Sequence, residues 1–263
     1  MDGYSYVGPA AAGHDFDSLS GTAHGDFQSV TPVPQATEDG RGRRNRARRH
    51  VRWLRRMLNA DVRTDCEVLQ GVLWPFVKGE SAVLISQALL KAFRTFGGVI
   101  HAPIDRLMAI HGVSEGAATA LRMAGCAAVH LLRQKISNEP ILYTDMAIKD
   151  YLIGKMQHER VEVALVLYLD ANYRLIGDEI LWRGTINRCP VYPREILKRC
   201  LDLDVHALIL SHNHPSGYLQ PSREDIEITK AIVDAASVFD IQVRDHIIVG
   251  HGECSSFRQR HLI

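Results

Sequence analysis

The segment Ser211-His-Asn-His-Pro-Ser-Gly-Tyr-Leu-Gln-Pro-Ser-Arg-Glu-Asp225 decides the fold of this chain. It continues an apolar run that begins at residue 206 and predicts a buried strand. Pro215 and Gly217 then turn the chain, and Ser222 opens a helix that we expect to reach about Phe239. A strand, a polar loop and a helix in this order are typical of a mixed α/β domain.

The neighbouring segments predict the rest of this domain, residues 145–263. We expect a helix after Asp145, a buried strand over 162–169, a turn at 170–172 and a returning strand over 173–182. A helix from Pro193 to about Leu201 and a last long strand over 241–249 follow. Because hairpins join some strands and helices join others, we expect the sheet not to be purely parallel.

Two histidines and one aspartate in this segment form a candidate metal site. His212 and His214 are two residues apart at the end of a strand, where side chains i and i+2 point the same way. Asp225 follows eleven residues after His214, on the first turn of the next helix. Two imidazoles and a carboxylate form a known catalytic zinc set that leaves one position open. Ser222 and Asp225 also fit a helix capping box, and both interpretations can hold together.

Metal-assisted hydrolysis also needs a proton acceptor. Glu162 opens the apolar strand 162–169, a position that is unusual for a carboxylate unless the end of the strand faces a cleft. Glu159 is the close rival, although we expect it in the preceding loop. A solvated charge at the start of a strand is the alternative for either residue.

The first 144 residues differ in character from the rest. Residues 1–40 carry six acidic residues and no Lys or Arg, whereas residues 41–56 hold nine arginines, so we predict a disordered acidic and then Arg-rich tail over 1–50. This arm either contacts DNA or another polyanion, or is simply solvated. Residues 51–136 predict a helical domain and 137–144 a linker. The candidate nucleic-acid contacts in the arm are Arg43, Arg44, Arg46, Arg48 and Arg49.

Within the helical domain, residues 107–121 resemble a helix-hairpin-helix. The glycine-rich turn of that motif lets backbone N–H groups approach a phosphate. Here Ser114 stands at the second glycine position and Glu115 follows it, so a packing hairpin without DNA contact is the alternative. We also expect the helix that contains residues 82–93 to stop at Gly97-Gly98.

Composition limits the possible classes of protein. Of the 263 residues, 46% are hydrophobic and 23% charged, which excludes a fibrous or wholly disordered chain. We see no membrane span and no secretory signal, so we expect a cytoplasmic protein. The five cysteines include no Cys-x-x-Cys pair, which argues against a disulfide framework and a thiolate zinc cluster, and we interpret them as small buried residues.

The second half of the chain resembles the RadC family, the bacterial branch of the JAB/MPN domains with the JAMM metal motif. The resemblance covers about 100 residues in one order. Besides the 211–225 segment, it rests on Leu-Tyr-Leu-Asp170, Arg-Gly-Thr-Ile-Asn187, Val-Tyr-Pro-Arg-Glu195, Ile-Glu-Ile-Thr229 and Asp245-His-Ile-Ile-Val-Gly250. Residues 51–136 resemble the family's helical N-terminal region more weakly. Asp245 and His246 lie outside the metal motif, and we interpret them as a structural pair, with support of the metal ligands as the alternative.

The resemblance implies a mixed sheet flanked by helices, related to the cytidine-deaminase-like fold. It implies a zinc ion (Zn²⁺) held by His212, His214 and Asp225, with Glu162 as general acid/base and Ser222 as the stabiliser of an oxyanion. The expected function is a zinc metallohydrolase that cleaves a peptide or isopeptide bond in an unidentified peptide or protein substrate. The alternative is a DNA-associated repair or recombination factor that uses the arginine arm or the hairpin. A zinc deaminase is excluded because it would need His-x-Glu and Pro-Cys-x-x-Cys, whereas a metal-dependent nuclease stays open.

Overall fold

The computed structural model describes residues 55, 59, 64–77, 80–138, 145–184 and 192–263. The predicted tail, with its candidate DNA contacts Arg43, Arg44, Arg46, Arg48 and Arg49, lies outside these residues. The same holds for most of the predicted linker and for Cys189.

Five helices build the described part of the helical region. They are α2 (Asp65–Leu73), α3 (Glu80–Phe93), α4 (Phe96–Ile100), α5 (Ile104–Met108) and α6 (Glu115–Asn138). Their apolar faces form one core, in which Leu69, Leu89, Leu107 and Leu121 are fully buried. Thr64 begins α2 with a capping box, in which its side chain accepts from the N–H of Glu67 and the Glu67 carboxylate accepts from the N–H of Thr64.

Two boundaries in this region differ from the prediction. The helix α3 ends at Phe93, where Arg94 takes a positive φ of 70°, so Gly97 and Gly98 do not stop it. They lie inside α4 instead, and the prediction of a helix end there is wrong. The helix α6 runs to Asn138, two residues into the predicted linker, because Ile136 is buried against the next domain.

The predicted hairpin is formed by α5, a turn and α6. Gly112 in the turn has a φ of 88°, a conformation that favours glycine. Ser114 does not need such a conformation, because its side chain caps α6 by accepting a hydrogen bond from the N–H of Ala117 at 3.3 Å. Contact between this hairpin and DNA stays a prediction.

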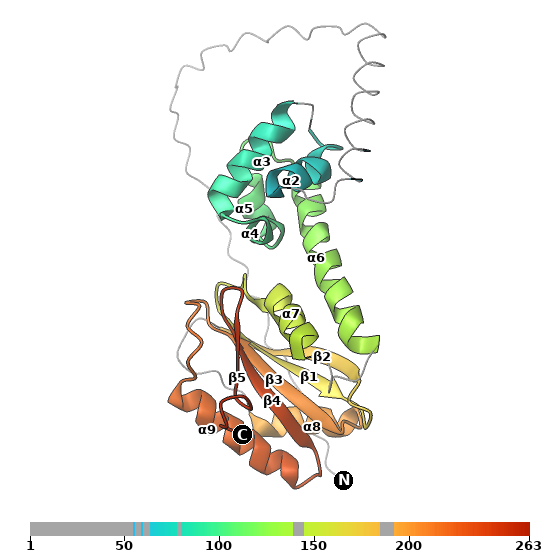
Figure 1. The fold of residues 1–263 in the computed structure, drawn as a ribbon, viewed down its shortest axis with the longest axis vertical. Helices are drawn as coiled ribbons and strands as arrows, with labels where there is room; N and C mark the ends of the chain where they lie inside the picture. Colours follow the sequence, from blue (N-terminus) through green and yellow to red (C-terminus); the bar gives the residue numbers. More distant parts are fainter. Residues whose placement is uncertain (1–54, 56–58, 60–63, 78–79, 139–144, 185–191) are drawn as a thin grey trace, which may run out of the picture. The chain divides into compact units, whose positions relative to one another are not determined.

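The second half of the chain contains a mixed five-stranded sheet (Figure 1). The strands are β1 (Glu162–Leu169), β2 (Leu175–Gly184), β3 (Ala207–Asn213), β4 (Gln242–Val249) and β5 (Cys254–Ser256), in the order β2-β1-β3-β4-β5. The β1–β2, β1–β3 and β4–β5 pairs are antiparallel, and β3–β4 is parallel. The fold is therefore the expected mixed α/β arrangement, with one short strand, β5, that the sequence did not predict.

Helices cover both faces of this sheet, as Figure 1 shows. The helix α7 (Asp145–Met156) packs on one face with Leu165, Leu167 and Ile209. The helices α8 (Pro193–Asp202) and α9 (Arg223–Ser237) pack on the other face with Val166, Tyr168, Leu208 and Leu210. Because helices cover both faces of the sheet, β1 and β3 are buried on both sides and consist mainly of apolar residues.

The cysteines follow the prediction only in part. All four described cysteines are free, but only Cys200 is buried, while Cys126 is exposed. Among the described helices, none has both the length and the apolar character that crossing a membrane requires.

Candidate metal centre

Three side chains converge where β3 ends and α9 begins. The Nε2 atoms of His212 and His214 are 3.0 Å apart. Asp225 places its Oδ1 atom 3.4 Å from the Nε2 of His212 and its Oδ2 atom 3.7 Å from the Nε2 of His214. One nitrogen or oxygen atom from each residue lies within 4.8 Å of the others, which is close enough for all three to hold one metal ion.

A chain of hydrogen bonds fixes the tautomer of His212. The Thr229 hydroxyl donates to the backbone carbonyl of Asp225 at 2.5 Å, so it accepts from the Nδ1–H of His246 at 2.6 Å. The Nε2 of His246 is then an acceptor, and the Nδ1–H of His212 donates to it at 2.7 Å. This arrangement leaves the Nε2 of His212 unprotonated and directed at the cluster, as a metal ligand requires.

A single hydrogen bond fixes the tautomer of His214, which also leaves its Nε2 atom unprotonated. Its Nδ1 lies 2.5 Å from the backbone carbonyl of Tyr218, and because a carbonyl only accepts, Nδ1 carries the proton. The loop that supplies this carbonyl turns at Gly217, whose φ is 79°. A Cβ at Gly217 would also lie 2.8 Å from the His251 ring, so both the backbone conformation and the close packing require glycine there.

The capping box of α9 positions Asp225. The Oδ2 atom of Asp225 accepts from the backbone N–H of Ser222 at 2.8 Å, and the Ser222 hydroxyl accepts from the N–H of Asp225 at 3.0 Å. The capping interpretation is confirmed, and the same carboxylate faces the two imidazoles, as the interpretation as a metal ligand requires. Since Ser222 uses its oxygen as the acceptor, its hydroxyl proton stays available for donation.

Electrostatics in the cluster favour the ionised carboxylate. Burial raises the pKa of Asp225, but the neighbouring imidazoles of His212 and His214, when they carry a proton on Nε2, outweigh burial and hold that pKa well below its usual range. The Asp225 carboxylate in turn raises the pKa of His214 against the effect of burial. These Nε2 protons are the ones that a bound metal ion would replace. Burial lowers the pKa of His246 well below its usual value, so that ring is neutral, in agreement with the tautomer derived above.

The sheet register places Glu162 on the same face as the cluster. Ala164 on β1 lies opposite His212 on β3, and Glu162 is two residues before Ala164, so the three side chains share one face. Glu162, His212 and Asp225 line one small cavity of about 60 Å³, whose other walls are mainly apolar side chains that include Trp182 and Ile228. The carboxylate thus stands beside the cluster, where a proton acceptor would be needed.

The rival carboxylate has a different environment. Glu159 lies in the loop before β1 and forms an ion pair with Arg183 at 2.8 Å. It lines a separate cavity that includes none of the three cluster residues. Of the two candidates, only Glu162 borders the cluster.

The two interpretations of Asp245 and His246 each fit one of these residues. Asp245 is structural, since its carboxylate accepts from the Ser256 hydroxyl and from the N–H of Arg258 near the C-terminal turn. His246, by contrast, contacts His212 directly, and Thr229 completes the chain. The available signal was a histidine directly before the apolar residues 247–249 of β4, but only the pairing of β3 with β4 places it behind His212.

The donor set fits a zinc ion. Two imidazoles with free Nε2 atoms and one ionised carboxylate are the ligand types that zinc prefers, and three protein ligands leave a coordination position open. A magnesium or calcium site would be built from oxygen atoms instead.

Comparison with known proteins agrees with this geometry. Residues 142–262 match the model of the RadC-like JAB domain. A UPF0758 protein of Rhodobacter capsulatus is 39% identical over 204 residues, which cover 78% of this chain and 95% of the relative. UPF0758 proteins of Methylibium petroleiphilum and Ruegeria pomeroyi are 36% and 37% identical, over 76% and 74% of this chain and 90% and 87% of the relatives. The family model covers the residues of the candidate metal site, and the relatives match over most of both chains, so this protein belongs to the UPF0758 family of RadC-like proteins.

Proposed function

We propose that this protein is a zinc-dependent hydrolase that cleaves peptide or isopeptide bonds. The observation that carries the proposal is the convergence of His212, His214 and Asp225 beside Glu162, with both imidazoles in the tautomer that metal binding requires. A zinc ion at this cluster would lower the pKa of a water molecule and polarise a substrate carbonyl.

Glu162 is the proton carrier in this proposal. Its carboxylate accepts the proton that the attacking water loses as the C–O bond forms. It then delivers that proton to the nitrogen as the C–N bond breaks, so the amine leaves neutral. The position of Glu162 on the wall of the cluster cavity supports this role.

Ser222 is the candidate oxyanion stabiliser. Its hydroxyl oxygen is engaged by the N–H of Asp225, which fixes where the oxygen lies and leaves the hydroxyl proton free to point elsewhere. A donor held in place before the reaction stabilises developing negative charge without a reorganisation cost. In this proposal the cap of α9 therefore holds the Ser222 hydroxyl in place before the oxyanion forms.

A matched pair of carboxylate variants tests the proposal. Zinc content is measured on the purified full chain, and cleavage is measured on a panel of fluorogenic amide and isopeptide substrates. We expect about one zinc per chain, and we expect Glu162→Gln to keep the zinc while losing at least about 100-fold in cleavage rate. Glu159→Gln is the control and should keep both properties, because its partner is Arg183. A chain without zinc, or a Glu162→Gln variant that cleaves at the full rate, would contradict the proposal.

A further inference from the structure

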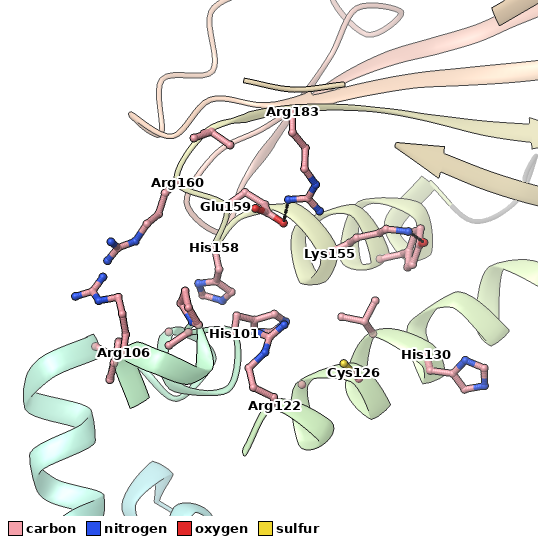
Figure 2. Close-up of a pocket in the computed structure, with 18 of the residues that line it drawn as sticks. His101, Arg106, Arg122, Cys126, His130, Lys155, His158, Glu159, Arg160 and Arg183 are labelled. Atoms are coloured by element: carbon pink, nitrogen blue, oxygen red, sulfur yellow. Dashed lines mark hydrogen bonds and ion pairs between the residues drawn. The ribbon is translucent and has the colours of Figure 1, made fainter. Parts of the chain in front are cut away.

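A second and larger cavity lies away from the metal centre, with a volume of about 1030 Å³ (Figure 2). Its walls come from the end of α3, from α4 to α7, from residues 158–161 and from β2. None of His212, His214, Asp225 or Glu162 lines it. The proposed hydrolase therefore gives this cavity no role.

The cavity is strongly basic. Two carboxylates line it, and both are already paired: Asp178 with Arg133 and Lys155, and Glu159 with Arg183. Seven cationic side chains line it, namely Arg94, Arg106, Arg122, Arg133, Lys155, Arg160 and Arg183. Among the described residues that line the cavity, no carboxylate is left to pair with Arg94, Arg106, Arg122 or Arg160.

These four arginines keep most of their donors unused. Arg122 donates to the backbone carbonyl of Ile100 at 3.1 Å, and Arg106 lies over the Phe93 ring at 5.5 Å. Within the described residues, the side chains of Arg94 and Arg160 have no hydrogen-bond or ion-pair partner, although the backbone N–H of Arg94 donates to the carbonyl of Leu90. Figure 2 shows the guanidinium groups of Arg106 and Arg160 extending toward one another from different parts of the fold. Like charges that face each other define a place where an anion would be stabilised.

Two histidines add a second polar feature to the same cavity. The rings of His101 and His158 stack with their centroids 4.6 Å apart, and among the described residues the Nε2 atoms of both are buried without a hydrogen-bond partner. Gly97 allows this stack, because a Cβ there would lie 2.6 Å from the Nε2 of His158. Buried polar atoms in proteins are nearly always bonded, so two unpaired ring nitrogens in one cavity indicate a missing polar partner.

We propose that this cavity binds a small phosphorylated molecule, with a phosphate group held between Arg106 and Arg160. The planar guanidinium group matches the oxygens of a phosphate with two parallel hydrogen bonds, and two such groups from different elements can hold one phosphate from both sides. The volume is large enough for a ligand of up to nucleotide size.

The probes are ADP, inorganic pyrophosphate and adenosine, each titrated into the full chain by calorimetry in magnesium-free buffer. We expect ADP and pyrophosphate to bind and adenosine not to bind. ADP binding more tightly than pyrophosphate assigns the site to nucleotides, and equal binding assigns it to the polyphosphate group itself. If neither phosphorylated probe binds, or if adenosine binds as well as ADP, the proposal is wrong.

Charge variants decide whether the cavity is responsible. Arg106→Ala and Arg160→Ala should each raise the Kd at least about tenfold, because each removes a charge-assisted contact. Arg160→Lys, which keeps the charge but not the two-pronged geometry, should lie between these variants and the unmodified chain. Arg194→Ala is the matched control, since Arg194 is 80% exposed on α8 and outside the cavity. Equal Kd values in all four variants would contradict the proposal.

Two further measurements test whether the phosphate binds at the candidate metal site or on a nucleic-acid surface instead of in this cavity. His212→Ala should bind ADP as the unmodified chain does, and a loss of binding there would move the ligand to the metal centre and overturn the proposal. A 20-nucleotide single strand should bind no more tightly than ADP. If only the oligonucleotide binds, the proposal is wrong, and the same Arg106→Ala and Arg160→Ala variants show whether the cavity or the arginine arm holds the strand.

Discussion

The Nδ1 atom of His212 lies 2.7 Å from the Nε2 atom of His246, which joins a metal-cluster residue on β3 to a buried residue on β4. The chain continues through Thr229 to the backbone carbonyl of Asp225, so it links two of the three cluster residues. One set of hydrogen bonds therefore fixes the tautomer of His212 and ties the first turns of α9 to the sheet.

Replacement of His246 should weaken metal binding without removing a ligand. In His246→Ala, the Nδ1–H of His212 loses its acceptor, and we expect zinc affinity to fall about 10- to 100-fold. His246→Gln, whose amide oxygen can still accept that proton, should recover part of the affinity. Competition with a chromophoric chelator measures both variants. Zinc affinity unchanged in His246→Ala would show that the tautomer does not depend on this residue.

Ser222→Ala should lower both stability and cleavage rate, and a second capping box separates the two effects. The loss of the cap on α9 should cost about 1 kcal/mol of unfolding free energy. Thr64→Ala removes the equivalent cap on α2, so it should cost a similar amount and leave the cleavage rate unchanged. Thermal denaturation and initial rates are the measurements. If Ser222→Ala cleaves as fast as Thr64→Ala, the hydroxyl of Ser222 has no part in the reaction.

Asp178→Ala should be strongly destabilising. This carboxylate is 5% exposed and binds Arg133 on α6, at 2.7 Å, as well as Tyr151 at 2.7 Å and Lys155, both on α7. Burial raises the pKa of Asp178, but the bonds from Lys155 and Arg133 outweigh it and lower the pKa. Removal of the charge leaves its three partners uncompensated, at a cost of about 3–5 kcal/mol of unfolding free energy.

The neighbouring residue supplies the control for Asp178. Glu179 pairs with Arg199, but both side chains are about two-fifths exposed, so Glu179→Ala should shift the urea midpoint far less. If the two variants unfold at the same urea concentration, the Asp178 network does not stabilise the fold in the way described.

The half-buried His158 should make the protein less stable at mildly acidic pH. Burial, together with the charges of His101 and His251, lowers the pKa of His158 to about 4. The unfolded chain binds this proton near pH 6.5, whereas the folded chain binds it only near pH 4. Stability is therefore fully present above pH 6.5 and should fall, by an amount on the order of 1 kcal/mol, as the pH drops toward 4.

Two glutamine variants check this dependence. Melting temperatures at pH 7.5 and pH 5.0 should differ less in His158→Gln than in the unmodified chain. His111→Gln, which replaces an exposed histidine in the turn before α6, should keep the full difference. A pH response that is the same in all three proteins would show that the proton is taken up elsewhere.

The sequence determined the elements that carry the candidate metal site. Apolar runs predicted β1 and β3, and β1 begins and ends where expected, because both of its faces are buried. The i, i+2 spacing of His212 and His214 and the Ser222–Asp225 cap are local features, so the candidate ligands were readable without a fold. The end of α3 was not readable, because Arg94 ends the helix in a conformation that its residue type does not favour.

Only the tertiary structure decided which distant residues support these local features. His246 and Thr229 lie behind His212 because β3 pairs with β4 in one register and α9 packs over that face. The basic cavity was even less predictable from the sequence, because its arginines come from segments up to 89 residues apart, from Arg94 to Arg183. Spacing along the chain reports only neighbours within one turn or one strand, whereas contacts between elements depend on register and packing that no single segment encodes.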